Sequence, residues 1–543
     1  MEPFVQLSRA LVLLSLVSAC STGENATGPG TCRPPTCLPA TSAYAVEVTA
    51  TGEGALPSTE FTAVALDSST GNLTLDLPAT AHVSGNVLAG MLPVPGTLVF
   101  SRPSRIPGRP YVYYQTTIDS QGGYTVGLPT NVTGERYTIR MRPADASSFV
   151  PLSTTATITA DTALDLPVPT GVDLLSLHGS LTDAVKVAIA GARVVLRDGV
   201  TQTDLSNTSV TDALGQFDIS VPSTATNATG SLLLLIQRGD ATSGLVTVSV
   251  QLAASQLGNA VTQAAFMQLT LPALPAASHL TFTVLGASSS GTNKPVPGAS
   301  VQLVTTLESV DGLGSQRVTH EVDGQTAADG TLVAELYSNA QQARMYTVRV
   351  VPPADSEFQS TTQTVVVSAA SGYAQAILLG LRPLVTGRIV GPDKVALKGA
   401  LLSPSASFVI TEGGVSSPTN MSAPGSATTD STGRFALHID GAEYDLGLSP
   451  PASATLPRTW LSRQSILGDV DLGDLALPSP VTFDAVVRGV DQRPVMATVR
   501  LYLVPAADPT CDAATSRCTP TPLLQAEGAT GKDGKASLLL PAD

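Results

Sequence analysis

The sequence predicts an all-β protein made of tandem Ig-like or transthyretin-like β-sandwich domains in a string. Three observations favour this fold: a composition suited to short strands, alternation of apolar and polar residues, and turn motifs that recur about every hundred residues. Charged residues make up 13% of the 543-residue chain and aromatic residues 4%, whereas Gly (47) and Pro (40) are abundant. This mixture is typical of many short strands joined by turns and argues against long amphipathic helices.

The chain begins with features of an exported lipoprotein. Arg9 precedes an apolar run from Ala10 to Val17, which has the length of a signal-peptide core and is too short to span a bilayer. Residues 17–20, Val-Ser-Ala-Cys, resemble the lipobox of bacterial lipoproteins. The resemblance implies that residues 1–19 are removed as a signal peptide and that Cys20 carries the acyl chains of a membrane anchor.

The anchor is followed by a tether. Residues 20–41 are rich in Gly, Pro and Thr and have no apolar period, so we expect them to lift the folded part off the membrane. By analogy with the sorting of lipoproteins in enteric bacteria, Ser21 after the lipidated cysteine favours the outer membrane of a Gram-negative bacterium.

Four landmarks then recur in a fixed order: a short β-rich opening, a Pro-Gly or Gly-Ala turn with an alternating strand, an Asp-then-Gly turn with another such strand, and a strand that often begins with an aromatic residue. In the third landmark the Asp side chain caps the reversal and the Gly supplies a positive φ. Successive Asp-Gly turns lie 93, 117, 101 and 103 residues apart, the size of one sandwich, counted from Asp119, Asp212, Asp329, Asp430 and Asp533.

These landmarks resemble the carboxypeptidase regulatory-like domain, a transthyretin-like β-sandwich. The best copy covers residues 177–236, and a second good copy starts near residue 385. The resemblance implies a sandwich fold for most of residues 42–543, and generic Ig-like bacterial surface domains are the close alternative. The matching positions are Gly179, Gly191, Ala192, Val194, Thr211, Asp212, Gly215 and Phe217 in the first copy, and Gly387, Gly399, Ala400, Thr429, Asp430, Gly433, Phe435 and Tyr444 in the second.

The repeats give a domain plan with two incomplete ends. The first segment looks like the second half of a repeat, and the last looks like a first half. Truncation, pairing of each half with its neighbour and a permuted domain all remain open, because unpaired sandwich halves would expose strand edges. The expected segments are a partial repeat at 42–80, whole repeats at 81–172, 173–276, 277–382 and 383–478, and an incomplete repeat at 479–543.

Cysteine usage agrees with export. Apart from Cys20, the cysteines form two short-range pairs, Cys32 with Cys37 and Cys511 with Cys518. In an exported chain such pairs indicate local disulfide loops. Metal binding is the alternative, but neither pair has CxxC spacing and no His lies close in the sequence.

We find no motif for catalysis. HExxH, GxSxG, SxxK, GxGxxG and Walker A patterns are absent, so we expect neither an enzyme nor a cofactor nor a catalytic metal. The net charge of −14 argues against nucleic acid as a partner. Asp469, Asp471 and Asp474 faintly resemble a Ca²⁺ loop, but a turn between strands explains them equally well. Trp460, the only tryptophan, is expected to be a packing anchor.

The densest aromatic cluster is the candidate ligand site. Tyr111, Tyr113 and Tyr114 stand together near Arg105 and Arg109. Exposed rings could stack on a sugar or a peptide. On an alternating strand, Tyr111 and Tyr113 face one way and Tyr114 the other, so at least one ring is expected in the core.

The sequence therefore predicts a non-catalytic, membrane-anchored lipoprotein whose repeats act as an extended structural or interaction scaffold at the cell envelope. The alternative is a carbohydrate- or peptide-binding or adhesion module that uses loops at the sandwich ends. The expected partners are the membrane, through the N-terminal lipid, and a surface glycan or protein.

Overall fold

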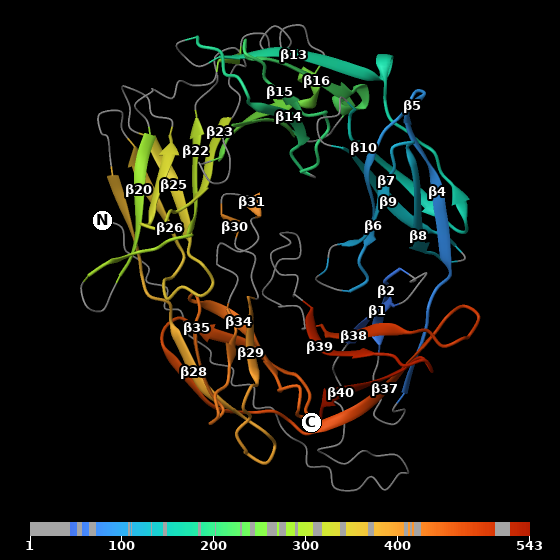
Figure 1. The fold of residues 1–543 in the computed structure, drawn as a ribbon, viewed down its shortest axis with the longest axis vertical. Helices are drawn as coiled ribbons and strands as arrows, with labels where there is room; N and C mark the ends of the chain where they lie inside the picture. Colours follow the sequence, from blue (N-terminus) through green and yellow to red (C-terminus); the bar gives the residue numbers. More distant parts are fainter. Residues whose placement is uncertain are drawn as a thin grey trace, which may run out of the picture.

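The structure, a computed structural model, consists of five β-sandwiches arranged as a ring (Figure 1). Within the described residues, no helix is long and apolar enough to cross a membrane. The structure describes residues 44–542 except for 52–56, 65–71, 107–108, 110, 132, 145–148, 183–185, 201, 228–230, 239–244, 258–268, 271–278, 288–291, 308–317, 337–343, 368–373, 407–410, 413–414, 417–424 and 505–521.

Sandwiches 1 and 2 follow each other in the first half of the chain. Sandwich 1 contains β4 (Thr80–Ala89), β5 (Leu92–Pro93), β6 (Gly96–Pro103), β7 (Tyr111–Ile118), β8 (Gly123–Pro129), β9 (Glu135–Pro143), β10 (Leu152–Ile158), β11 (Thr162–Ala163) and β12 (Leu166–Pro167). Sandwich 2 contains β13 (Leu174–Thr182), β14 (Arg193–Asp198), β15 (Ser209–Val210), β16 (Gln216–Pro222), β17 (Ser231–Arg238), β18 (Leu245–Ala253) and β19 (Leu269–Thr270), with short 3-10 turns η1 (Gly171–Asp173), η2 (Ser223–Asn227) and η3 (Ala254–Gln256).

Sandwiches 3 and 4 continue around the ring. Sandwich 3 contains β20 (His279–Gly286), β21 (Lys294–Pro295), β22 (Ser300–Leu307), β23 (Val318–Gln325), β24 (Thr331–Glu335), β25 (Arg344–Val351), β26 (Thr361–Val367) and β27 (Ala374–Leu379). Sandwich 4 contains β28 (Leu384–Val390), β29 (Leu401–Ala406), β32 (Ala427–Thr428), β33 (Arg434–His438), β34 (Ala442–Ser449), β35 (Thr459–Ile466) and β36 (Val470–Ala476). The small hairpin of β30 (Thr411–Glu412) and β31 (Val415–Ser416), between β29 and β32 in the chain, is a separate sheet that lies in the interior of the ring (Figure 1).

Sandwich 5 is built from both ends of the described chain. It combines β1 (Tyr44–Ala50), β2 (Thr59–Val64) and β3 (Asn72–Asp76) with β37 (Pro480–Arg488), β38 (Ala497–Leu503), β39 (Leu523–Ala529) and β40 (Lys535–Pro541). β1 pairs antiparallel with β38 over seven residues, and β3 pairs parallel with β37 over five. The two half-repeats expected from the sequence thus pair with each other. This arrangement differs from truncation, from pairing of each half with its adjacent repeat and from a permuted domain.

All five sandwiches share one strand order. The first strand of each pairs antiparallel with the strand after the Asp-Gly turn and parallel with the last strand, as β4 does with β8 and with β11 and β12. The sheet β10-β9-β6-β7 of sandwich 1 corresponds strand for strand to β2-β1-β38-β39 of sandwich 5. Figure 1 shows the sheets of β6, β14, β22, β29 and β38 on the inner side of the ring and the sheets of β4, β13, β20, β28 and β37 on the outer side.

The Asp-Gly turns are nearly identical in geometry. Gly433, for example, has φ +77, and a Cβ there would lie 2.7 Å from the backbone oxygen of Ile389. Asp430 Oδ1 accepts hydrogen bonds from the amides of Thr432 and Arg434. A glycine is required because the position combines a left-handed φ with close backbone contact. The same two features occur at Gly122, Gly215, Gly330, Gly433 and Gly534.

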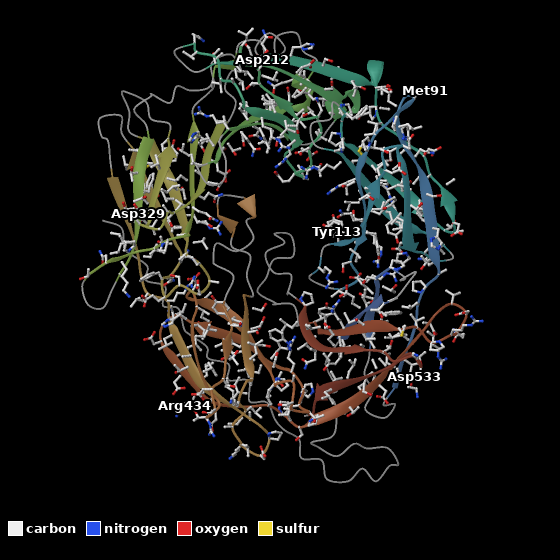
Figure 2. The ribbon with its side chains drawn as sticks, viewed as in Figure 1. Met91, Tyr113, Asp212, Asp329, Arg434 and Asp533 are labelled. Carbon is white, nitrogen blue, oxygen red and sulfur yellow. The ribbon has the colours of Figure 1, made fainter. Side chains whose placement is uncertain are left out.

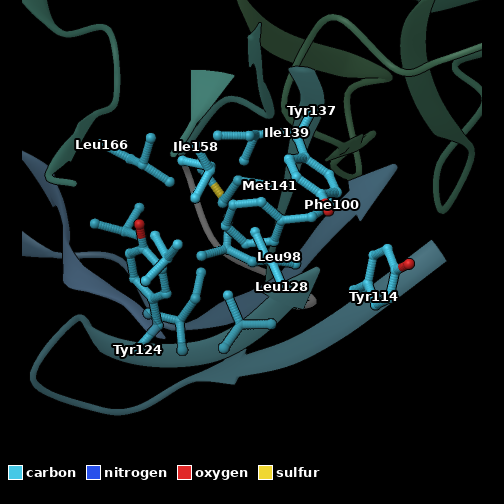
Figure 3. Packing of buried hydrophobic residues seen from close by; sticks show 14 of the residues in the cluster. Leu98, Phe100, Tyr114, Tyr124, Leu128, Tyr137, Ile139, Met141, Ile158 and Leu166 are labelled. Carbon is cyan, nitrogen blue, oxygen red and sulfur yellow. The ribbon is translucent and has the colours of Figure 1, made fainter. Parts of the chain in front are cut away.

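Each sandwich has its own apolar core. In sandwich 1 the strands contribute alternate residues, so that Leu98 and Phe100 of β6 pack against Ile139 and Met141 of β9 (Figure 3). Tyr137, which leads the aromatic strand, is fully buried and donates a hydrogen bond to the carbonyl of Pro129. Tandem all-β sandwiches, the fold class expected from period-two alternation, are therefore confirmed.

The expectation of an extended string is wrong for the described residues. β1 and β3 complete the sheets of β38 and β37, so the row of sandwiches closes on itself. The physical reason is the exposed edges that half-sandwiches carry: pairing the two halves satisfies both sets of backbone groups.

Candidate functional site

The three predicted tyrosines lie on β7, at the edge of the inner sheet of sandwich 1. The side chains of Tyr111 and Tyr113 are 48% and 59% exposed, with ring centroids 6.2 Å apart. Tyr114 points the other way, is only 8% exposed and donates a hydrogen bond to the carbonyl of Ser58 in sandwich 5. The structure thus presents two of the three rings to solvent and uses the third at a junction.

Tyr113 lines a cleft between sandwiches 1 and 2, and Figure 2 shows it on the inner side of the ring. The cleft has a volume of about 490 Å³. Its floor is the ring-facing side of β6, β7, β9 and the start of β10, and its wall comes from sandwich 2. The floor includes Val99, Ser101, Tyr113, Arg140, Arg142 and Ser153; the wall includes Asp198, Thr203, Asp204, Leu205, Pro222 and Thr224. A second hollow of about 300 Å³ continues along the same junction and shares Arg142, Pro151 and Asp204 with the first.

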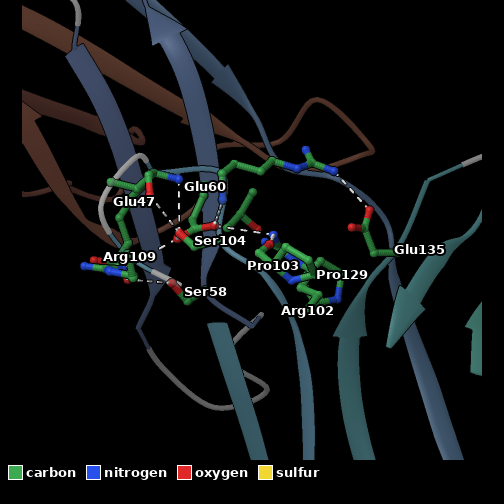
Figure 4. Close-up of polar contacts among 12 residues, drawn as sticks. Glu47, Ser58, Glu60, Arg102, Pro103, Ser104, Arg109, Pro129 and Glu135 are labelled. Carbon is green, nitrogen blue, oxygen red and sulfur yellow. Dashed lines mark hydrogen bonds and ion pairs between the residues drawn. The ribbon is translucent and has the colours of Figure 1, made fainter. Parts of the chain in front are cut away.

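A buried polar cluster joins sandwich 5 to sandwich 1 (Figure 4). Glu60 of β2 accepts hydrogen bonds from the Ser104 hydroxyl at 2.7 Å, the Arg105 amide at 2.8 Å and Arg102 Nη1 at 3.4 Å. Arg109 Nη1 lies 3.6 Å from Glu60 Oε1. Since the Glu60 side chain has no exposed surface, its charge is compensated entirely by these donors.

Glu47 extends this cluster to the C-terminal half of sandwich 5. Its carboxylate accepts hydrogen bonds from Arg109 Nη1 at 3.0 Å and from the Tyr502 hydroxyl at 2.8 Å. Burial raises the pKa of Glu47, but the hydrogen bond from Tyr502 and the attraction of Arg109 outweigh it, so the pKa lies below its ordinary value. The guanidinium of Arg109 also lies 5.2 Å from the centroid of the Tyr502 ring. Three distant parts of the chain thus meet at one charged site.

The other junctions are joined in different ways. β18 of sandwich 2 pairs with β23 of sandwich 3, which makes one eight-stranded sheet. Arg382 of sandwich 3 and Asp440 of sandwich 4 form a buried ion pair at 3.0 Å. Trp460 Nε1 donates to the carbonyl of Leu524 across the junction of sandwiches 4 and 5. The tryptophan is thus an inter-sandwich contact, close to its expected role as a packing anchor.

The remaining candidates either lie outside the described residues or make separate local contacts. Cys20, Cys32, Cys37, Cys511 and Cys518 all lie outside the described residues. The aspartates of the suggested Ca²⁺ loop are used separately: Asp469 Oδ1 accepts from the Leu384 amide and Asp471 Oδ1 from the Gly473 amide. In the part of the chain that the structure describes, no three His, Cys, Asp or Glu side chains are grouped so as to hold a metal ion.

Sequence reasoning missed most residues of both sites. Arg140 and Arg142 carry no motif, and only the alternation of β9 places them on the ring-facing side. Glu60 and Arg102 are 42 residues apart, and only their burial identifies them. A charged residue at an apolar position of an alternating strand, such as Arg102 after Phe100 on β6, is the signal that would have indicated a buried partner.

Comparison with known proteins identifies no family for this chain. No protein-family model and no curated protein sequence matches it. Among solved structures, the Bacillus anthracis TIE protein aligns at 8% identity over 74% of each chain with a TM-score of 0.18. A mutant of the shaft pilin SpaA from Lactobacillus rhamnosus GG aligns at 16% identity over 37% of this chain and 96% of the pilin, with a TM-score of 0.20. A DUF3823 family protein from Parabacteroides merdae aligns at 12% identity over 30% of this chain and 90% of its own length, with a TM-score of 0.14. Scores this low transfer no function to this chain.

Proposed function

We propose that this protein is a non-catalytic interaction scaffold, held at the envelope of a Gram-negative bacterium by lipid on Cys20. The closure of five sandwiches into a ring through β1–β38 and β3–β37 pairing carries the proposal, because it fixes five inner sheets relative to one another. A closed frame of this kind can present binding surfaces in fixed relative positions, and this role needs no catalytic residues. The shared strand order of the five sandwiches supports five copies of one domain, and the motifs of residues 177–236 are the basis for proposing a relationship to the carboxypeptidase regulatory-like domain.

The tether sets how far the ring can stand from the membrane. Twenty-three residues separate Cys20 from Tyr44 at the start of β1. A linker of this length, rich in Gly, Pro and Thr, spans at most about 80 Å when fully extended. The ring would therefore stay close to the outer membrane, with sandwich 5 nearest the anchor. Disulfides between Cys32 and Cys37 and between Cys511 and Cys518 belong to the same proposal, since the envelope is an oxidising compartment.

Two measurements test the proposal. In cells fed an alkyne-tagged fatty acid, the wild-type chain should be labelled and sediment with membranes, whereas the Cys20→Ala variant should be unlabelled. If the wild-type chain is unlabelled and sediments with membranes to the same extent as the Cys20→Ala variant, the lipid anchor is contradicted. Small-angle X-ray scattering of the purified chain should show a closed particle; a maximum dimension on the order of 170 Å, as for five sandwiches in an open row, would contradict the ring scaffold.

A further inference from the structure

We propose that the cleft between sandwiches 1 and 2 binds an oligosaccharide that carries carboxylate groups. The inference rests on the proposed scaffold function and names the ligand that one part of the scaffold takes. The cleft volume of about 490 Å³ falls within the ordinary range for small-ligand sites, about 300–1,000 Å³. Its chemistry follows from the charge, the aromatic ring and the backbone geometry of the inner sheet.

The floor of the cleft is basic. Two arginines, Arg140 and Arg142, line it. Arg136, Arg140 and Arg142 alternate with the core residues of β9 and are all exposed. By the same alternation, no Asp or Glu occupies a ring-facing position of β6, β7, β9 or β10. Within the described residues, Arg140 has neither an ion pair nor a side-chain hydrogen bond, so its charge is available to an anionic ligand.

Asp204, one of the two carboxylates of the wall, does not cancel this charge. Asp204 Oδ1 lies 2.7 Å from Arg197 Nε, so that carboxylate already has a cationic partner. Asp198 Oδ1 accepts a hydrogen bond from the Val200 amide at 2.8 Å. The guanidinium of Arg140 can therefore form a bidentate pair with a carboxylate of the ligand, which is the geometry that arginine favours.

Tyr113 supplies an apolar surface on the same face. Ser101 pairs with Tyr113 across β6 and β7, and Val99 pairs with Arg140 across β6 and β9. Tyr113 and Arg140 are thus two strands apart and offset by two residues, a Cα separation of about 12 Å from standard sheet spacings. A ligand that spans them must have both a C–H-rich face for the ring and an anionic group some distance away. An acidic oligosaccharide has both, because the face of a pyranose packs on an aromatic ring.

The geometry favours a saccharide over an acidic peptide. Extended peptides usually bind to a free sheet edge through main-chain hydrogen bonds. The cleft instead lies over the face of the sheet β10-β9-β6-β7, so its floor presents side chains and not the free main-chain groups of a sheet edge. Hydroxyl groups that suit sugar hydroxyls line both sides of the cleft, with Ser153 on the floor and Thr224 on the wall.

The test is calorimetric titration of the full chain with trigalacturonate, its fully methyl-esterified form, a hyaluronan tetrasaccharide and triglutamate. At least one acidic saccharide should bind saturably, and added salt should weaken the binding. Arg140→Gln and Tyr113→Ala should each weaken that binding about tenfold or more. The ester should bind at least tenfold more weakly than trigalacturonate if the latter is the ligand.

The control comes from the same strand as Arg140. Arg136→Gln changes an exposed residue of β9 that does not line the cleft, and it should leave the affinity within about twofold. No binding of either acidic saccharide up to about 10 mM, or affinities unchanged in Arg140→Gln and Tyr113→Ala, would overturn the assignment. Triglutamate that binds as well and competes would replace the saccharide with an acidic peptide. In each of these cases the scaffold function is judged separately: it remains supported if the chain carries the lipid anchor and its ring is closed.

Discussion

Glu60 and Arg102 form a buried ion pair between the first and second segments of the chain, with Nη1 of Arg102 3.4 Å from Oε2 of Glu60 and side chains 0% and 3% exposed. Glu60 belongs to sandwich 5 and Arg102 to sandwich 1. Their contact therefore fixes the position of sandwich 5 relative to sandwich 1.

Replacing Glu60 by Gln should destabilise the chain by about 3–5 kcal/mol, because the variant leaves the buried Arg102 charge uncompensated. Urea unfolding at neutral pH measures the change. The matched control is Glu135→Gln, which removes an ion pair with the half-exposed Arg105 and should cost no more than about 1 kcal/mol. Equal losses in the two variants would contradict the role given to the buried pair.

The Glu47 cluster should make stability depend on pH in the acid range. Its pKa in the folded chain lies below the ordinary 4.5, with burial opposed by Tyr502 and Arg109. A lowered pKa gives stability that is complete above about 4.5 and is lost as the pH falls through the folded-state value. The stability difference between wild type and Glu47→Gln should therefore shrink below that pH, and Tyr502→Phe should reduce the effect. A stability difference between wild type and Glu47→Gln that does not change with pH would contradict the lowered pKa of Glu47.

His320 should add a second pH dependence, of the same sign but in a higher range. It lies inside β23, in contact with Tyr346, and burial together with repulsion from Arg238 lowers its pKa to about 4. Since the unfolded chain binds this proton near pH 6.5, stability should fall as the pH drops from about 6.5 to about 4. His320→Phe should remove this slope from urea titrations, whereas His438→Phe, at an exposed position, should keep it. A slope unaffected by His320→Phe would refute the assignment.

The turn glycines should be intolerant of a side chain. Gly433→Ala places a Cβ 2.7 Å from the Ile389 oxygen at φ +77 and should cost about 2 kcal/mol or more. Gly380→Ala is the control, because no heavy atom lies within 4 Å of its added Cβ, and it should change the stability by about 0.5 kcal/mol or less. Thermal unfolding compares the two; a smaller loss at Gly433 than at Gly380 would show that the turn geometry is not required.

Local patterns predicted the sandwiches but not their arrangement. Alternation on β7 correctly separated Tyr114, which is buried, from Tyr111 and Tyr113, which are exposed. Period-two alternation and Asp-Gly turns depend on neighbours in the sequence, so they can be read from it. The pairing of β1 with β38 depends on where four intervening sandwiches place the two edges, and no local pattern encodes that.

The candidate site divides in the same way. Tyr113 was predicted from its aromatic neighbours, whereas the wall of the cleft, including Asp204, comes from another sandwich. Arg140 becomes noticeable only when β9 is set beside β6 and β10 in register. The sequence pattern identifies residues of a single strand, whereas residues of two sandwiches form the site.

The split composition of sandwich 5 also imposes an order on synthesis. Glu47 and Tyr502, which share a hydrogen bond, are 455 residues apart in the chain. β1 and β3 are synthesised before the four internal sandwiches, and their partners β38 and β37 after them. During the intervening chain growth, the unpaired edges of the earlier strands must be kept from pairing with another molecule. The four internal sandwiches need no strand from outside their own segments, so sandwich 5 is the last of the five to receive all its strands.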